Sequence, residues 1–187
     1  MKKVLLVIAL AIAFFTNVSA QKEKGFGAQI ELGYGFGAGE TYFNVFQISA
    51  MPGYHFNPYV FAGIGIGFNS YSAIGGNLST FPIFAHATVN LLPHKTFTPF
   101  VAMKIGYGIG NRSVDATYND YDIKASIKQG FYIAPSVGVK YRLNKGNAIS
   151  IGLIYDVMTF RTSLSGIVNS SVSANNNALA IRLGWEF

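Results

Sequence analysis

Apolar residues alternate with small or polar residues along most of the chain after residue 20. In segment 26–37 the even positions hold Phe, Ala, Ile, Leu, Tyr and Phe, whereas the odd positions hold Gly, Gln and Glu. This two-residue period is typical of a β-strand with one apolar face, and no segment after residue 20 shows the 3.6-residue period of an amphipathic helix. The alternation recurs in seven more segments: 44–56, 59–69, 81–91, 98–109, 130–143, 148–158 and 179–187. The pattern therefore predicts an all-β protein with eight strands.

The connections between these segments alternate between short and long. Short turns are expected at 57–58, 92–97 and 144–147, and longer polar loops at 70–80, 111–129 and 161–176. The first connection, at 38–43, is the exception: the alternation would allow a long loop there, but the segment is short. In outer-membrane barrels the short turns face the periplasm and the longer loops face outward. The same arrangement here would place both termini in the periplasm.

A soluble β-sandwich would also alternate, so the polar positions decide what the apolar face meets. These positions hold mostly Gly, Ala and Ser instead of charged residues, and charged residues make up 12% of the chain against roughly 25% in soluble domains. The apolar positions carry no charge. Small residues suit the interior of a narrow barrel, and an uncharged outer face suits lipid. Aromatic residues form two sets near the strand ends: Tyr54, Phe56, Tyr59, Tyr141, Trp185 and Phe187, then Phe36, Phe46, Phe68, Phe81, Tyr107 and Phe131.

Lipid also requires a closed sheet, because an open edge would leave backbone groups without hydrogen bonds. We therefore predict a transmembrane up-and-down antiparallel β-barrel of eight strands. The strands, most of about 10 to 14 residues, are long enough to cross a membrane when tilted.

Residues 1–20 have the features of a cleaved secretory signal peptide. Lys2 and Lys3 precede an apolar run at 4–15, and Val18-Ser19-Ala20 provides a small-residue cleavage site. Twelve apolar residues are too few for a transmembrane helix, which needs about 20. The barrel domain is thus expected to comprise residues 21–187. The chain has no cysteine, which excludes disulfides and a lipoprotein anchor.

Several charged residues fall on the inward positions of the predicted strands. Glu31 and Arg182 lie at similar depth on the first and last strands, which closure brings together, so we expect them to pair. Lys104 and Asp156 are expected to join them across the lumen, and Lys140, Arg142 and Glu186 complete the inward set. We favour a plug of ion pairs that stabilises the barrel over a gate or selectivity element, since eight strands leave room only for side chains.

Catalysis, cofactors and nucleic-acid binding are not expected. The glycine repeats lie inside strands, whereas a dinucleotide site needs a strand, a turn and a helix. His55, His86 and His94 are not at the outer rim, where a lipid-modifying enzyme would need a histidine beside a serine and an acid. The basic residues are scattered, which disfavours nucleic acid.

The segment 111–129 offers two weaker binding hypotheses. The oxygens of Asp115, Asn119, Asp120 and Asp122 suit a hard cation, but their spacing fits no calcium loop and no metal site is predicted. The basic side chains Arg112, Lys124 and Lys128 suit lipopolysaccharide phosphates.

These features together resemble the small outer-membrane β-barrel proteins of the OmpA/OmpX type, including the outer membrane protein β-barrel domain family. The resemblance rests on the exported signal, the eight amphipathic strands and the terminal sequence LGWEF. It implies that the last strand is the signal read by the barrel-assembly machinery. Its apolar residues are Leu179, Ile181, Leu183, Trp185 and Phe187. Unlike full-length OmpA, the chain has no periplasmic peptidoglycan-binding domain after the barrel, so a cell-wall anchoring role is not expected.

The resemblance implies a non-enzymatic outer-membrane protein. Its outer loops would have a structural role or bind an extracellular ligand, in contact with outer-membrane lipid and lipopolysaccharide. A narrow porin-like channel for small solutes or ions is the alternative, and a lipid-modifying enzyme is a distant third.

Overall fold

The computed structural model describes residues 24–38, 43–73, 76–118, 121–143, 147–165 and 170–187. The signal peptide predicted at 1–20 therefore lies outside the described residues. The strands are β1 (Gly25–Gly37), β2 (Phe43–His55), β3 (Val60–Ala73), β4 (Gly76–Asn90), β5 (Phe97–Ile109), β6 (Asn111–Tyr118), β7 (Tyr121–Arg142), β8 (Ala148–Ser165) and β9 (Ser170–Glu186). Among these residues no helix is long and apolar enough to cross a membrane.

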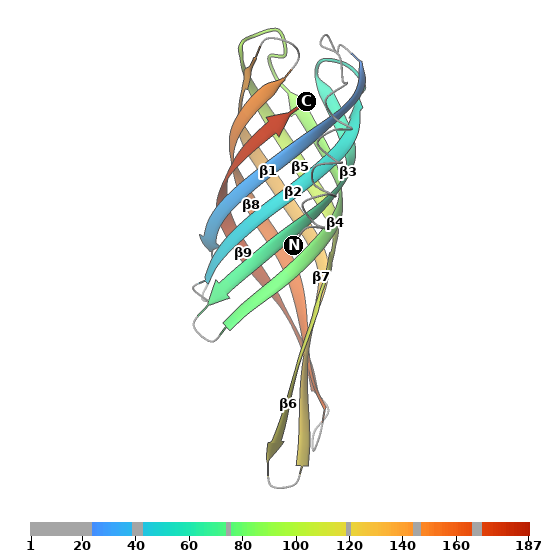
Figure 1. Ribbon diagram of the computed structural model, residues 1–187, viewed down its shortest axis with the longest axis vertical. Helices are drawn as coiled ribbons and strands as arrows, with labels where there is room; N and C mark the ends of the chain where they lie inside the picture. Colours follow the sequence, from blue (N-terminus) through green and yellow to red (C-terminus); the bar gives the residue numbers. More distant parts are fainter. Residues whose placement is uncertain (1–23, 39–42, 74–75, 119–120, 144–146, 166–169) are drawn as a thin grey trace, which may run out of the picture.

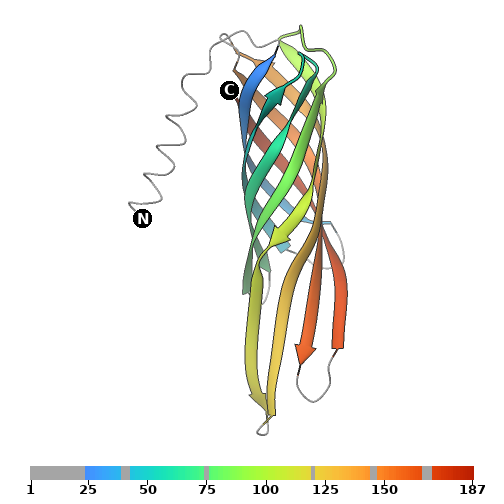
Figure 2. The ribbon, with the colours of Figure 1, turned by 90° about the vertical axis from the view of Figure 1, so that its right-hand side faces the viewer.

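The strands form one closed antiparallel barrel (Figures 1 and 2). The hydrogen-bonded order is β5-β4-β3-β2-β1-β9-β8-β7-β6, and β5 also pairs with β7, which closes the ring. β6 follows β5 after Gly110 and pairs with β7. Because β5 and β6 occupy successive parts of one position in the wall, the barrel has eight strands. The predicted fold is confirmed.

Several segments predicted as loops are instead extensions of the strands. At 111–129, β6 and the first part of β7 form a hairpin paired as far as Tyr118 and Tyr121, and β8 and β9 remain paired as far as Leu164 and Ser170. At 70–80, β3 continues to Ala73 and β4 begins at Gly76. The loop predictions were wrong because backbone pairing continues where the apolar alternation stops. Figure 2 shows these extensions projecting from the end opposite the C-terminus, which we call the loop end; the other is the turn end.

The two faces of the wall follow the predicted alternation. On β5 the Lys104 side chain points into the barrel, and the residue is 1% exposed, whereas the next residue, Ile105, is 46% exposed. On β3, Phe61 is fully buried and Ile64 is 71% exposed. The outer face is therefore apolar and open, while the inner face is packed.

Glycines on the inner face make room for large side chains. A Cβ atom at Gly65 would meet the ring of Phe84 and lie 2.7 Å from the Met51 side chain. A Cβ atom at Gly138 would lie 2.7 Å from the ring of Phe100. The lumen is therefore filled from both sides, as expected for eight strands.

The exposed aromatic residues form contacts at both ends of the apolar wall. At the turn end the ring centroids of Trp185 and Phe187 are 6.2 Å apart, and those of Phe97 and Tyr141 are 5.2 Å apart. At the loop end Phe68 and Phe81 form a contact with ring centroids 5.3 Å apart. Such aromatic girdles are typical of the two interfaces of a membrane barrel.

The exposed wall between the girdles predicts the effect of a charge placed there. Ile64→Arg should lower the free energy of unfolding in lipid vesicles by about 2–4 kcal/mol, because Ile64 is near the middle of the lipid-facing wall. Urea unfolding followed by tryptophan fluorescence measures this loss. Ser171→Arg, on the exposed extension of β9, is the matched control and should change the free energy little. Equal losses in the two variants would contradict a lipid-facing position for Ile64.

Candidate functional site

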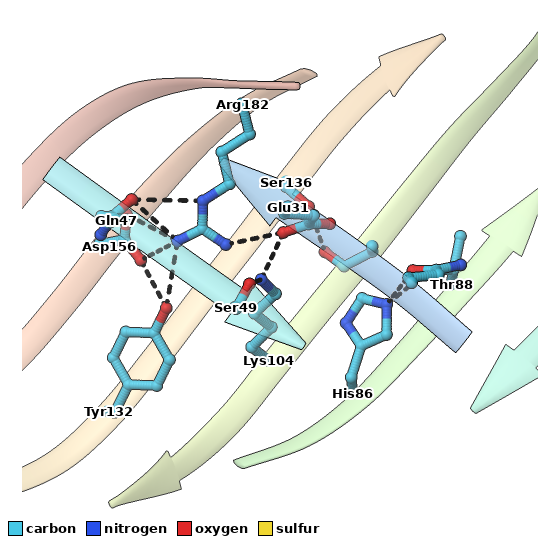
Figure 3. A network of polar contacts seen from close by, with 12 residues as sticks. Glu31, Gln47, Ser49, His86, Thr88, Lys104, Tyr132, Ser136, Asp156 and Arg182 are labelled. Carbon is cyan, nitrogen blue, oxygen red and sulfur yellow. Dashed lines mark hydrogen bonds and ion pairs between the residues drawn. The ribbon is translucent and has the colours of Figure 1, made fainter. Parts of the chain in front are cut away.

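Arg182 lies at the centre of an ion-pair network inside the barrel (Figure 3). Its guanidinium donates from Nη1 to Glu31 Oε2 at 3.1 Å and from Nη2 to Asp156 Oδ1 at 3.0 Å. Its backbone neighbours are Gly33 on β1 and Gly152 on β8. Because neither neighbour has a side chain, the guanidinium has room to extend along the inner wall to both carboxylates. The structure thus brings Glu31 and Arg182 together.

Lys104 joins this network from the opposite side of the lumen. Its ammonium donates to Glu31 Oε2 at 2.5 Å and to the Ser49 hydroxyl at 3.2 Å. The same ammonium lies 5.0 Å from the centroid of the Phe84 ring, a cation–π distance. Glu31 therefore accepts from cations on β5 and β9 at once.

Two uncharged residues complete the bonding around Arg182. Gln47 Oε1 accepts from Arg182 Nη2 at 3.0 Å, and Gln47 Nε2 donates to Asp156 Oδ2 at 3.1 Å. The Tyr132 hydroxyl donates to Asp156 Oδ1 at 2.7 Å. We did not predict these two roles, although both residues fall on the inward positions of their strands. The central cluster comprises Glu31, Gln47, Ser49, Lys104, Tyr132, Asp156 and Arg182.

A second cluster of polar side chains lies nearer the turn end. Lys140 Nζ and Gln29 Nε2 donate to Glu186 Oε2 at 2.5 and 2.7 Å. His55 Nε2 lies 3.6 Å from Glu186 Oε1. Arg142, the remaining cation of the predicted inward set, is exposed and donates to the Thr98 hydroxyl at 3.2 Å. Charge pairing therefore continues toward the turn end.

His55 and His94 lie at the turn end, and His86 lies within β4. His86 is buried, and its Nε2 is 2.8 Å from the Thr88 hydroxyl and 3.0 Å from Gln29 Oε1. In the described part of the chain His86 Nδ1 has no hydrogen-bond partner, so no carboxylate orients the ring. A histidine–hydroxyl contact without an orienting acid, closed off from the surface, lacks the arrangement needed to activate a nucleophile.

The acidic segment considered for a hard cation, for which no metal site was predicted, falls mostly beyond what the structure describes. Asn119 and Asp120 lie outside the described residues, and of Asp115 and Asp122 only the backbone is described, as it is for Arg112 and Lys124. The described residues contain no group of three or more His, Asp or Glu side chains suited to a metal ion.

Little free space remains in the middle of the barrel. A cavity bordered by Glu31, Phe100, Ser136 and Arg182 has a volume of about 10 Å³. This is close to the smallest space that holds one water molecule, roughly 10–15 Å³. The central cluster, together with the Phe84 and Phe100 rings, occupies the lumen at this level.

Comparison with known proteins agrees with this architecture. The chain matches the family described as outer membrane protein beta-barrel domain over residues 6–187. It belongs to that family. No curated protein sequence matches it significantly.

Two solved structures share the fold of this family member. The crystal structure of Neisserial surface protein A is 13% identical in sequence and has a TM-score of 0.54. The match covers 88% of this chain and 98% of the Neisserial chain. The outer membrane protein OprG from Pseudomonas aeruginosa is 12% identical, with coverages of 90% and 98% and a TM-score of 0.58. At these identities the similarity shows the barrel fold alone.

The apolar residues of the terminal strand face outward, toward the lipid in which the family resides. Leu179, Ile181, Leu183 and Trp185 are 50%, 56%, 56% and 39% exposed. The backbone N–H of Phe187 donates to Ala28 O at 2.9 Å, which continues the seam between β9 and β1 to the last residue. The role of these terminal-strand residues as a signal for the barrel-assembly machinery stays a prediction.

Loss of Arg182 should weaken the barrel strongly. Arg182→Leu leaves Asp156 and Glu31 buried with fewer donors, and breaking such a pair costs about 3–5 kcal/mol. We expect unfolding in lipid vesicles to occur at a lower urea concentration. In samples heated stepwise before gel electrophoresis, the band of the folded form should disappear at a lower temperature. Arg142→Leu removes the same charge from an exposed site and should have little effect. Unchanged heat and urea resistance in Arg182→Leu would rule out a stabilising network.

Proposed function

We propose that the protein is a non-conducting outer-membrane barrel with a structural or surface-binding role, whose loop end faces the outside and whose termini are periplasmic. The observation that carries this proposal is the filled lumen. The central cluster joins side chains from β1, β2, β5, β7, β8 and β9, so opening a path would break several charge-assisted hydrogen bonds at once. A plug explains this bonding better than a gate does.

The strand extensions are the parts best suited to meet a ligand. Their backbone pairing continues past the strand positions of the loop-end aromatic residues, and the described part of β9 there carries exposed polar residues such as Ser171, Ser173 and Asn175. A paired β-hairpin offers a more rigid binding surface than a flexible loop. We assign the surface role to these hairpins.

Absence of catalysis is part of the same proposal. It is supported by the burial of the His86–Thr88 pair and by the lack of an acid partner at His86 Nδ1 among the described side chains. We further propose that the barrel-assembly machinery reads the outward residues of β9, since these form one continuous exposed apolar row.

Electrical recording distinguishes the closed barrel from the alternative, a narrow channel for small solutes or ions. The purified protein in a planar bilayer should give no reproducible conductance steps, because the lumen is filled at the central cluster. Reproducible steps whose size changes in Lys104→Met or Arg182→Leu would support the channel instead. Gel mobility of unboiled samples shows whether each variant is folded.

Cysteine labelling tests the orientation. The natural chain has no cysteine, so Ser171→Cys on β9 and Lys95→Cys in a turn each carry a single thiol. A membrane-impermeant maleimide should label Ser171→Cys on intact cells, and Lys95→Cys only after the outer membrane is permeabilised. The reverse pattern would overturn the proposed orientation.

A further inference from the structure

Two cations lie directly opposite each other on the outer face at the loop end. Lys128 of β7 and Arg161 of β8 are backbone partners in the sheet, and both are exposed. Like charges in this position repel and weaken the pairing of the strands. Within the described residues neither cation forms an ion pair with a carboxylate. The pair therefore has unused capacity to bind an anion.

A bulge in β7 brings the two cations together. Gln129 pairs with Phe160 and Tyr132 with Met158, so Gly130 and Phe131 oppose Thr159 alone. One extra residue reverses the inward and outward positions beyond it. Both Gln129 and Tyr132 therefore point inward, at 5% and 1% exposure, and Lys128 points outward. With strict alternation from Tyr132, Lys128 would point into the lumen.

The two cations border a hollow on the outer face. Its volume is about 280 Å³, and its lining includes Tyr107, Lys128, Phe131, Thr159, Arg161 and Ser173. Arg161 Nε donates to the Ser173 hydroxyl at 3.5 Å, which holds the guanidinium over the β8–β9 pair. The hollow thus combines two cations with hydroxyl groups and aromatic rings.

The aromatic residues locate this hollow relative to the membrane. Tyr107 and Phe131 are paired in the sheet, are 58% and 50% exposed, and belong to the loop-end girdle. Toward the turn end, the outward positions next to them are Ile105 and Ile133, on the apolar wall. A molecule that places an anion between the cations would thus have hydrocarbon beside it.

We propose that Lys128 and Arg161 bind a phosphate group of a lipid headgroup in the outer leaflet. Guanidinium and ammonium groups form charge-assisted hydrogen bonds with phosphate oxygens. The anion lies between the two cations and offsets their repulsion. The Ser173 hydroxyl, which accepts from Arg161, offers a further donor, and the acyl chains lie along the wall at Ile105 and Ile133. The choice of leaflet rests on the orientation proposed above.

Native mass spectrometry in a neutral detergent tests this site. The probe is diphosphorylated lipid A, compared with its fully dephosphorylated form and with inorganic phosphate. The double variant K128Q/R161Q should bind lipid A at least tenfold more weakly than the natural protein. The matched control K95Q/R142Q removes one exposed lysine and one exposed arginine at the turn end and should bind normally.

Three results would overturn the proposal: equal lipid A binding by K128Q/R161Q, equal binding of the dephosphorylated lipid, or inorganic phosphate binding as tightly as lipid A. A second variant, Lys128→Glu, places opposite charges at this position of the sheet and should remove lipid A binding while leaving the gel mobility of the folded barrel unchanged. Retained binding in this variant would also count against the site. Since the measurement is made in detergent, it is independent of orientation, and a reversed labelling pattern would overturn the choice of leaflet alone.

Discussion

Hydrocarbon offers no hydrogen bonds to the backbone, and the rest of this structure depends on that constraint. Every N–H and C=O group in the apolar wall must be paired within the sheet, so the sheet has to close. The β1–β9 and β5–β7 pairings achieve closure, and Phe187 continues the first of them to the end of the chain. With eight strands, the closed wall leaves a lumen only as wide as the side chains that fill it.

A lumen this narrow determines how the central cluster is built. Charges in such a space are poorly solvated, so each requires opposite charges and hydrogen-bond partners. The cluster holds two cations, Lys104 and Arg182, and two carboxylates, Glu31 and Asp156, which balance formally. Neutral donors and acceptors occupy the remaining bonding positions. The charged residues thus act as packing elements with fixed geometry, and the glycines beside Arg182 provide the space.

The sequence predicts a residue's place correctly where its position along a strand decides whether the side chain points into the lumen or toward the lipid. Alternation placed Arg182 and Glu31 on the inner face of the barrel, and closure of the first and last strands made them neighbours. Alternation does not specify how far a side chain reaches along the lumen, so the bonds of Gln47 and Tyr132 to Asp156 could not be predicted. The hairpin extensions were missed for a related reason. Beyond the lipid both faces of a strand meet water, and the apolar period that marks a strand disappears while its backbone pairing continues.

The apolar alternation of the sequence does not predict the bulge at Gly130 and Phe131. This bulge nevertheless decides which side chains of β7 lie in the lumen and which lie on the outer face. Without it, Lys128 would add a further cation to the lumen, near Phe160. Among the described residues, the carboxylates that form ion pairs in the lumen are already paired with other cations. An unpaired buried charge is strongly destabilising. The extra residue moves this charge to the outer face and places Gln129 inside, where its amide donates to Ser79 O at 3.3 Å. One inserted residue thus protects the charge balance of the plug and creates a cationic position at the membrane interface, so the interior and the outer surface of the barrel depend on the same local irregularity.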